Sequence, residues 1–213
     1  MNFFTFTKLG RTLLMLTAVT AVGLSGCGGD DNPNNNGGGA VPIDKWMKKN
    51  LDVPTDGSWC YGEGGEVYVD GVWKTLSSSE IQANCAKYGR LYTWEAAKSA
   101  CQSIGKRLPT NAEWEALVKA AGGWETAGKK LKARSGWYND GNGTDQYGFS
   151  ALPGGNRTSD DHFGTAGNNG IWWTATENSD GNVYYRSMYY NYDIVYEDNY
   201  DKSYGFSARC IQD

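Results

Sequence analysis

The fold can be worked out from one stretch in the middle of the chain, Arg107-Leu108-Pro109-Thr110-Asn111-Ala112-Glu113-Trp114. Thr110 and Glu113 have the spacing of a helix capping box. In this motif the threonine hydroxyl accepts from the Glu113 backbone N–H, and the carboxylate accepts from the Thr110 backbone N–H. The pattern predicts a helix over about residues 111–121 that ends at Gly122. Its apolar face carries Trp114, Leu117, Val118 and Ala121.

A second helix is predicted immediately before this stretch. Thr93 is a suitable N-cap for a helix over about residues 94–104, and Gly105 follows its end. At helical spacing, its inner face carries Trp94, Ala97, Cys101 and Ile104. Two short helices are therefore expected consecutively in the middle of the chain, with Cys101 pointing into the core.

Strand signals lie on both sides of the helices. Before them, Val67-Tyr68-Val69 and Val72-Trp73 flank Asp70-Gly71, which is a strong hairpin signal. After a glycine-rich segment, β-favouring runs occur at residues 171–176, 183–190, 194–196 and 204–211. The sequence therefore predicts an α+β domain with two short helices and a small antiparallel sheet, interrupted by long loops.

The N-terminus has the pattern of a lipoprotein signal. Lys8 and Arg11 precede an apolar run over residues 13–22, and Leu24-Ser25-Gly26-Cys27 follows it. The apolar run is shorter than the ~20 residues that span a bilayer. We therefore predict a signal peptide over 1–26 and a membrane anchor of fatty acids such as palmitate on Cys27. An ordinary signal peptide with an incidental cysteine is the alternative.

The next segment separates this anchor from the globular part. Residues 28–40 read GGDDNPNNNGGGA and contain no large apolar side chain, so residues 27–40 are predicted to be the lipidated cysteine and a flexible linker. Residues 41–213 are long enough for one domain with its own core. Gly28 is not the aspartate that commonly retains lipoproteins in the inner membrane, so we expect the outer membrane or cell surface.

The charge balance excludes one class of partner. Without residues 1–26 the chain keeps 18 basic residues against 24 acidic ones, a formal net charge of about −6. It has no cluster of lysine and arginine of the kind that binds a phosphate backbone. Nucleic acid is therefore not an expected partner. We also expect the protein to be a monomer and to contact the membrane only through its lipid anchor.

Four cysteines follow Cys27 in the sequence. An even number in an exported chain predicts two disulfides, for which three connectivities exist. A metal site is disfavoured because no two cysteines have C-x-x-C spacing and His162 is the only histidine. The cysteines are Cys60, Cys85, Cys101 and Cys210.

Six ordered motifs carry a resemblance to a known family. They are Trp46-Met47-Lys48-Lys49-Asn50-Leu51 with Cys60-Tyr61, then residues 88–94, 107–114, 148–155, 172–177 and 205–210. In this order they resemble the Fibrobacter succinogenes major paralogous domain family over about residues 42–213. That family is similar to the formylglycine-generating (sulfatase-modifying) superfamily and its C-type-lectin-like fold. The resemblance implies a helix-to-terminal-strand bridge, Cys101 with Cys210, which leaves Cys60 with Cys85.

No enzyme activity is predicted from these residues. Formylglycine-generating enzymes bind copper with a late cysteine pair, whereas residues 151–209 contain no cysteine. His162 lies in the polar run 158–163 and is interpreted as a solvated loop residue. The adjacent carboxylates Asp160-Asp161 and Glu197-Asp198 are interpreted as solvated surface. An enzyme related to the sulfatase-modifying oxidases is kept as the alternative.

No cofactor or metal is predicted either. The loop from Asp140 to Asp145 offers oxygen ligands, but Asp145 and Ala151 stand where an EF-hand needs glycine and glutamate. The sugar-binding Glu-Pro-Asn and Gln-Pro-Asp signatures of calcium-dependent lectins are absent from the sequence. An Asx-rich turn is therefore preferred over a calcium site.

Tyrosine is abundant between residues 172 and 206. Strand neighbours face opposite sides, so Tyr184-Tyr185 and Tyr189-Tyr190 must each supply one ring to either face. These rings either complete the core or form a recognition surface. A recognition surface would indicate a non-catalytic module that binds a glycan or a protein. Rings that complete the core would instead favour a structural envelope component. The candidate ligand-binding residues are Trp172, Trp173, Tyr185, Tyr189, Asn191, Tyr192, Asp193 and Tyr196.

Overall fold

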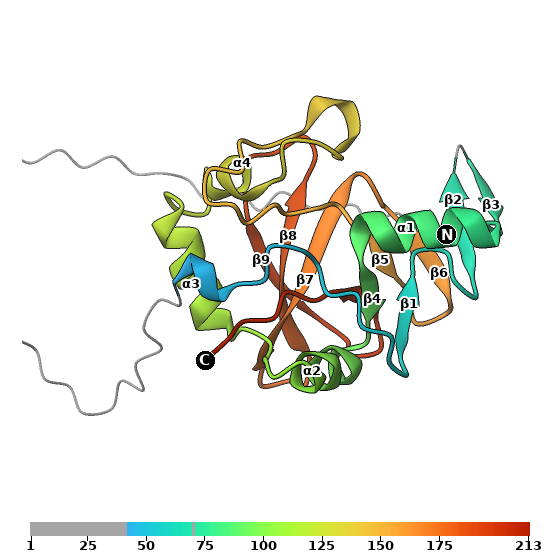
Figure 1. Cartoon of the computed structure of the whole chain (residues 1–213), viewed down its shortest axis with the longest axis horizontal. Helices are drawn as coiled ribbons and strands as arrows, with labels where there is room; N and C mark the ends of the chain where they lie inside the picture. Colours follow the sequence, from blue (N-terminus) through green and yellow to red (C-terminus); the bar gives the residue numbers. More distant parts are fainter. Residues whose placement is uncertain (1–41, 70) are drawn as a thin grey trace, which may run out of the picture. The chain divides into compact units, whose positions relative to one another are not determined.

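The computed structural model describes residues 42–69 and 71–213 (Figure 1). The predicted signal peptide over 1–26, Cys27, the predicted linker over 27–40 and Val41 lie outside the described residues, as does Asp70 of the hairpin. Among the described residues, no helix combines the length and the hydropathy that crossing a membrane requires.

The described chain forms an α+β domain with four α-helices and two mixed sheets. The helices are α1 Ser78–Tyr88, α2 Trp94–Ser103, α3 Asn111–Ala120 and α4 Ala127–Leu131, with 3-10 turns η1 Ile43–Lys45 and η2 Tyr138–Asp140. The larger sheet has the strand order β1 Ser58–Cys60, β4 Arg90–Tyr92, β10 Phe206–Ser207, β7 Asn169–Glu177, β8 Val183–Tyr189 and β9 Tyr196–Tyr200. The smaller sheet has the order β3 Val72–Lys74, β2 Glu66–Val69, β6 His162–Gly164 and β5 Asn156–Arg157.

The two predicted helices are confirmed as α2 and α3. Thr93 caps α2, and Thr110 and Glu113 form the complete capping box of α3. The placement of Ile104 on the inner face was wrong: α2 ends at Ser103, and Ile104 follows it with 39% of its surface exposed. Two helices were not predicted. The longer of these, α1, begins with a second capping box formed by Ser77 and Glu80.

The prediction of an antiparallel late sheet was wrong in one respect. β7, β8 and β9 are antiparallel neighbours, but β10 runs parallel to β7 with Ser207 opposite Trp172. The short segment over residues 201–205 leads from β9 to β10 and places β10 between β4 and β7, which a local pattern cannot indicate. The predicted strand at 194–196 is also displaced, because β9 starts only at Tyr196, and the run 204–211 contains just the two-residue β10.

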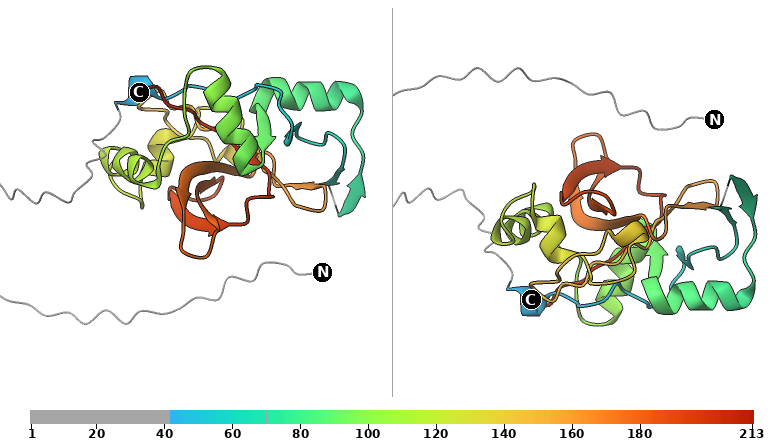
Figure 2. Two further views of the ribbon diagram at one scale, coloured as in Figure 1. Left: turned by 90° about the horizontal axis from the view of Figure 1, so that it is seen from below. Right: turned by 90° about the horizontal axis from the view of Figure 1, so that it is seen from above.

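The predicted hairpin is confirmed as β2 and β3, which pair with Val69 opposite Val72. β6 lies parallel to β2 and places His162 opposite Glu66. His162 is therefore in a short strand and not in a solvated loop as predicted. Its ring packs on Trp73 with the centroids 4.5 Å apart, and its Nδ1 lies 3.3 Å from an Asp160 carboxylate oxygen. Figures 1 and 2 both show this hairpin and α1 at the opposite end of the domain from α3.

The core is built on both faces of β7. Trp172 packs with Trp114 of α3 and with Leu131 of α4, in one cluster of buried side chains. Trp173, its neighbour on the strand, packs with Trp94 of α2 and with Phe206 in another. Strand neighbours point to opposite faces of a sheet. Because both tryptophans pack against helices, both sides of β7 are covered by helices.

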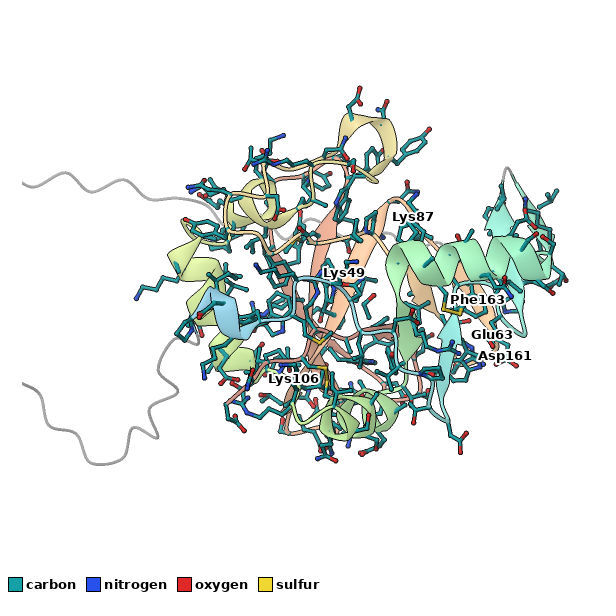
Figure 3. The ribbon with its side chains drawn as sticks, viewed as in Figure 1. Lys49, Glu63, Lys87, Lys106, Asp161 and Phe163 are labelled. Atoms are coloured by element: carbon teal, nitrogen blue, oxygen red, sulfur yellow. A yellow bond between two sulfur atoms is a disulfide. The ribbon has the colours of Figure 1, made fainter. Side chains whose placement is uncertain are left out.

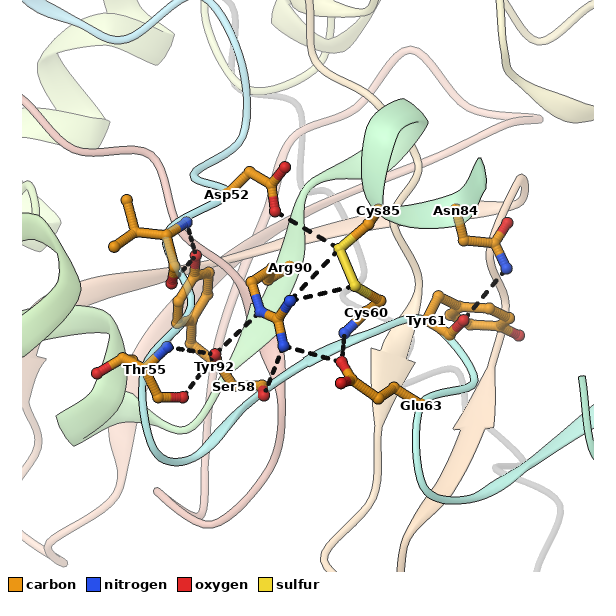
Figure 4. Close-up of a disulfide and its surroundings, with 11 residues drawn as sticks. Asp52, Thr55, Ser58, Cys60, Tyr61, Glu63, Asn84, Cys85, Arg90 and Tyr92 are labelled. Atoms are coloured by element: carbon orange, nitrogen blue, oxygen red, sulfur yellow. Dashed lines mark hydrogen bonds and ion pairs between the residues drawn. A yellow bond between two sulfur atoms is a disulfide. The ribbon is translucent and has the colours of Figure 1, made fainter. Parts of the chain in front are cut away.

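Two disulfides join α1 and α2 to other parts of the domain. Cys60 of β1 bonds to Cys85 of α1, and Cys101 of α2 bonds to Cys210 near the end of the chain (Figure 3). The expected pairing is thus confirmed. Beside the first bond, Arg90 donates to the Ser58 carbonyl oxygen and forms an ion pair with Glu63 (Figure 4).

Candidate functional site

The two tryptophans proposed for ligand binding are buried, so their assignment to a solvent-facing surface was wrong. Trp172 and Trp173 expose none of their surface. Their indole N–H groups donate within the core, Trp172 to the Asn50 side-chain oxygen at 2.9 Å and Trp173 to the Tyr92 carbonyl oxygen at 2.8 Å. The alternation of side chains along the strand holds, but helices cover both faces of β7.

Tyr185 lies at the edge of the core. Its ring packs edge-on against Phe206 with the centroids 5.2 Å apart. Burial, followed in importance by the charge of Asp198, raises the pKa of the Tyr185 hydroxyl above its ordinary value. Tyr185 therefore contributes to packing and is only partly available to a ligand.

Three of the predicted tyrosines come together where β8 turns into β9. Tyr189, Tyr192 and Tyr196 contact one another edge-to-face, with centroids 5.3 to 6.4 Å apart. Tyr192 is 49% exposed. Asn191 and Asp193, on either side of Tyr192 in sequence, are also exposed. We call Tyr189, Tyr192 and Tyr196 the tyrosine cluster.

The backbone beneath the tyrosine cluster is held by a buried lysine. Lys132 directly follows α4, and its ammonium donates to the carbonyl oxygens of Tyr189 at 3.2 Å and Tyr192 at 2.9 Å. Burial lowers the pKa of Lys132, opposed by the charge of Asp193. The helix also approaches closely: a Cβ on Gly128 would meet the Asp193 carbonyl oxygen at 2.6 Å. The β8–β9 turn is therefore fixed against α4.

Two members of the tyrosine cluster each line a hollow. The first has a volume of about 340 Å³ and lies between the β8–β9 turn and the region of α4 and η2; Asn191, Tyr192 and Asp193 line it. The second has a volume of about 550 Å³ and lies between α3 and β9; Tyr196 lines it. Four of the eight predicted residues thus line a hollow.

Two exposed aromatic side chains that sequence reasoning did not select border the same region. Trp124 is 58% exposed and lines the larger hollow. Tyr138 is 61% exposed and its ring lies 5.4 Å from that of Tyr190, which lines the smaller one. Both sit among turn residues, where no periodicity indicates which way a ring points. The sequence signal that could have identified them is a large aromatic residue in a glycine-rich segment. We call the tyrosine cluster, Trp124, Tyr138 and the two hollows the candidate binding face.

Asp140 of the loop considered for calcium lines the smaller hollow, whereas Asp145 of that loop is engaged in the fold. The Asp145 carboxylate accepts from the backbone N–H and hydroxyl of Ser150, each at 2.6 Å, so both of its oxygens are engaged. Among the described residues, no three histidine, cysteine or acidic side chains are grouped so that they could hold a metal ion.

Comparison with known proteins identifies the family. The sequence model of the Fibrobacter succinogenes major domain family matches residues 43–212. This range contains every helix and strand described above. No curated protein and no solved structure gives a significant match. The chain belongs to the Fibrobacter succinogenes major domain family.

Proposed function

We propose that this chain is a cell-envelope lipoprotein whose domain is a non-catalytic binding module for a glycan or a protein. The observation that carries the proposal is the candidate binding face. Rigid tyrosine and tryptophan rings provide contact area at low entropic cost, and neighbouring amide and carboxylate groups provide adaptable hydrogen bonds. The exposed rings of Trp124, Tyr138 and Tyr192 belong to neither of the two main buried clusters. They are therefore not needed to complete the core.

The proposed location follows from the N-terminal sequence. A signal peptide over 1–26 and a lipid on Cys27 would anchor the chain in the outer membrane or at the cell surface. The glycine- and asparagine-rich residues 28–40 would act as a tether with a root-mean-square span of about 20 Å. Such a tether lets the candidate binding face turn toward a ligand outside the cell.

We also propose that the domain has a C-type-lectin-like fold related to formylglycine-generating enzymes. The Cys101–Cys210 bond from a helix to the terminal segment supports this relationship, as does the succession of α2 and α3 before the late sheet. An oxidase activity of that superfamily is disfavoured because residues 151–209 contain no cysteine. Binding of copper by the purified chain, or oxidase turnover, would instead support the hypothesis of an enzyme related to the sulfatase-modifying oxidases.

Binding and stability measurements on matched variants test the proposal. The full chain is screened against a glycan array and in pull-downs with envelope extracts, and each ligand found is then measured with Tyr192→Ala and Tyr196→Ala. Because these rings are partly exposed, we expect binding to weaken by about 2 kcal/mol or more with the melting temperature nearly unchanged. Trp94→Ala and Trp114→Ala are the controls for buried rings and should lower stability by about 3 to 5 kcal/mol.

Two results would count against a binding module. One is the absence of any ligand in both screens. The other is a loss of stability in the Tyr192 and Tyr196 variants as large as that in the Trp114 variant, with no effect on binding. In either case the structural envelope component becomes the better description.

A further inference from the structure

The larger hollow, between α3 and β9, has a polar floor. Arg186 of β8 lines it with a side chain that is only 6% exposed. Its guanidinium donates to the Asn111 side-chain oxygen at 2.8 Å and forms an ion pair with Glu197. The Asn111 amide in turn donates to the Glu197 carboxylate at 3.2 Å. Three planar polar groups that line the hollow are therefore linked to one another.

One donor on this floor has no partner. The Arg186 Nε–H is buried and makes no hydrogen bond within the described part of the chain. A buried N–H without an acceptor is unfavourable, so such groups are normally satisfied by the protein, by water or by a ligand. This Nε is itself almost without exposed surface, so a ligand in the hollow meets the polar groups of Asn111 and Glu197, which line it.

The rim of the hollow is aromatic. Trp124 is more exposed than any other tryptophan that the structure describes, yet its backbone is fixed because its carbonyl oxygen accepts from the Val195 N–H at 2.9 Å. Tyr196 of the tyrosine cluster lines the same hollow. An indole on a fixed backbone can offer its apolar face to a ligand without a large entropic cost.

The charges around the hollow balance. Glu115 and Glu197 contribute two negative charges, and Lys119 and Arg186 contribute two positive ones. No single sign of charge is therefore available to select an ionic ligand. A large apolar side chain of a protein partner would also be a poor occupant, because it would cover Arg186 and Glu197 without pairing their remaining donors and acceptors.

We propose that the α3–β9 hollow binds one neutral sugar ring of a glycan, an inference that rests on the proposed binding function. The apolar C–H face of the ring stacks on Trp124. Its hydroxyl groups, each a donor and an acceptor, pair with the Asn111 side chain and the Glu197 carboxylate. The volume of about 550 Å³ lies within the ~300–1,000 Å³ typical of small-molecule sites.

The test measures binding of defined neutral sugars to the full chain. Methyl glycosides of glucose, galactose, mannose and xylose, and their short oligomers, are screened by saturation-transfer NMR, and those bound are titrated by tryptophan fluorescence. We expect at least one to bind, and Trp124→Ala to weaken it at least tenfold. Glu197→Gln should also weaken it while retaining the fold. The matched control is Trp73→Ala, an exposed tryptophan on β3 at the other end of the domain, which should bind like wild type.

The outcomes separate this inference from the general function. Undiminished sugar binding in both Trp124→Ala and Glu197→Gln overturns the hollow as the sugar site but leaves a glycan-binding module. Binding only of charged sugars such as glucuronic acid, or only of a protein in the pull-downs, overturns the neutral-sugar assignment and again leaves the binding function. If no glycan and no protein binds in any assay, both proposals are wrong.

Discussion

At the scale of single residues, Lys132 is the side chain whose role is most directly testable. It is almost completely buried, and its ammonium holds two carbonyl oxygens of the β8–β9 turn. Lys132→Met keeps most of the side-chain volume but leaves those oxygens without a donor. Because hydrogen bonds from charged groups contribute about 1.5 to 3 kcal/mol, we expect a stability loss of that order in urea unfolding.

The same variant should loosen the turn locally. Amide hydrogen exchange over residues 189–193 is expected to become faster than in wild type, because the tie between α4 and the turn is gone. Lys129→Met is the matched control, since Lys129 lies on the same helix with an exposed side chain. Equal stability and equal exchange in the two variants would contradict a role for Lys132 in fixing the turn.

At the scale of elements, the start of α3 depends on the Glu113 carboxylate. It accepts from the Thr110 backbone N–H at 2.7 Å and from two Arg107 nitrogens, each at 2.8 Å. Burial alone would raise the pKa of Glu113, but the hydrogen bonds from Arg107 and Thr110 outweigh it and lower the pKa below 4.5. The charged carboxylate therefore stabilises the helix above the unfolded-state pKa, and this contribution is lost as pH falls through the lower, folded-state pKa.

Glu113→Gln tests this contribution by removing the charge at nearly constant size. We expect the variant to be less stable than wild type by about 1 to 2 kcal/mol at pH 7, and the difference to shrink as pH is lowered from 5 toward 3. Stability is measured by denaturant unfolding at each pH. Glu95→Gln, at an exposed first-turn position of α2, should change little at any pH. A difference that grows on acidification would show that the pKa of Glu113 is shifted upward instead.

At the scale of the whole molecule, the two disulfides should contribute unequally. Cys101–Cys210 spans 109 residues in sequence, and Cys60–Cys85 spans 25. The chain-entropy model gives ~5 kcal/mol for the longer loop and ~3.5 kcal/mol for the shorter one. Replacing Cys101 and Cys210 by alanines should therefore destabilise the chain more in thermal unfolding than replacing Cys60 and Cys85. Equal losses would argue against the entropic account, and a Cys60–Cys210 peptide in non-reducing maps would refute the pairing.

Membrane attachment is also a property of the whole chain. If Cys27 carries the lipid, Cys27→Ser should leave the membrane fraction or remain unprocessed, because serine lacks the thiol that is acylated. Ser25→Ala keeps a small residue before the cleavage site and should fractionate like wild type. Fractionation uses membrane pellets and mass spectrometry of the N-terminal peptide. A processed Cys27→Ser protein that stays with membranes would contradict the anchor.

The candidate binding face could be predicted only in part from the sequence. The run from Tyr189 to Tyr196 was identified because aromatic and polar residues alternate there, and Tyr192 is indeed exposed. Trp172 and Trp173 were misplaced because alternation says that neighbours face opposite sides, not whether either side is open to solvent. Trp124 was not selected because its exposure depends on how the chain leaves α3.

Sequence by itself determined the features that depend on residues close together along the chain. The capping box of α3, the N-cap of α2 and the β2–β3 hairpin each rest on partners within a few positions. Only the tertiary structure decided the insertion of β10 beside β7, the covering of both faces of β7, and the meeting of Arg186 with Asn111. Ser207 lies 35 positions from Trp172, and Arg186 lies 75 positions from Asn111. Which such contacts form depends on the packing of the entire core, and no local pattern encodes that.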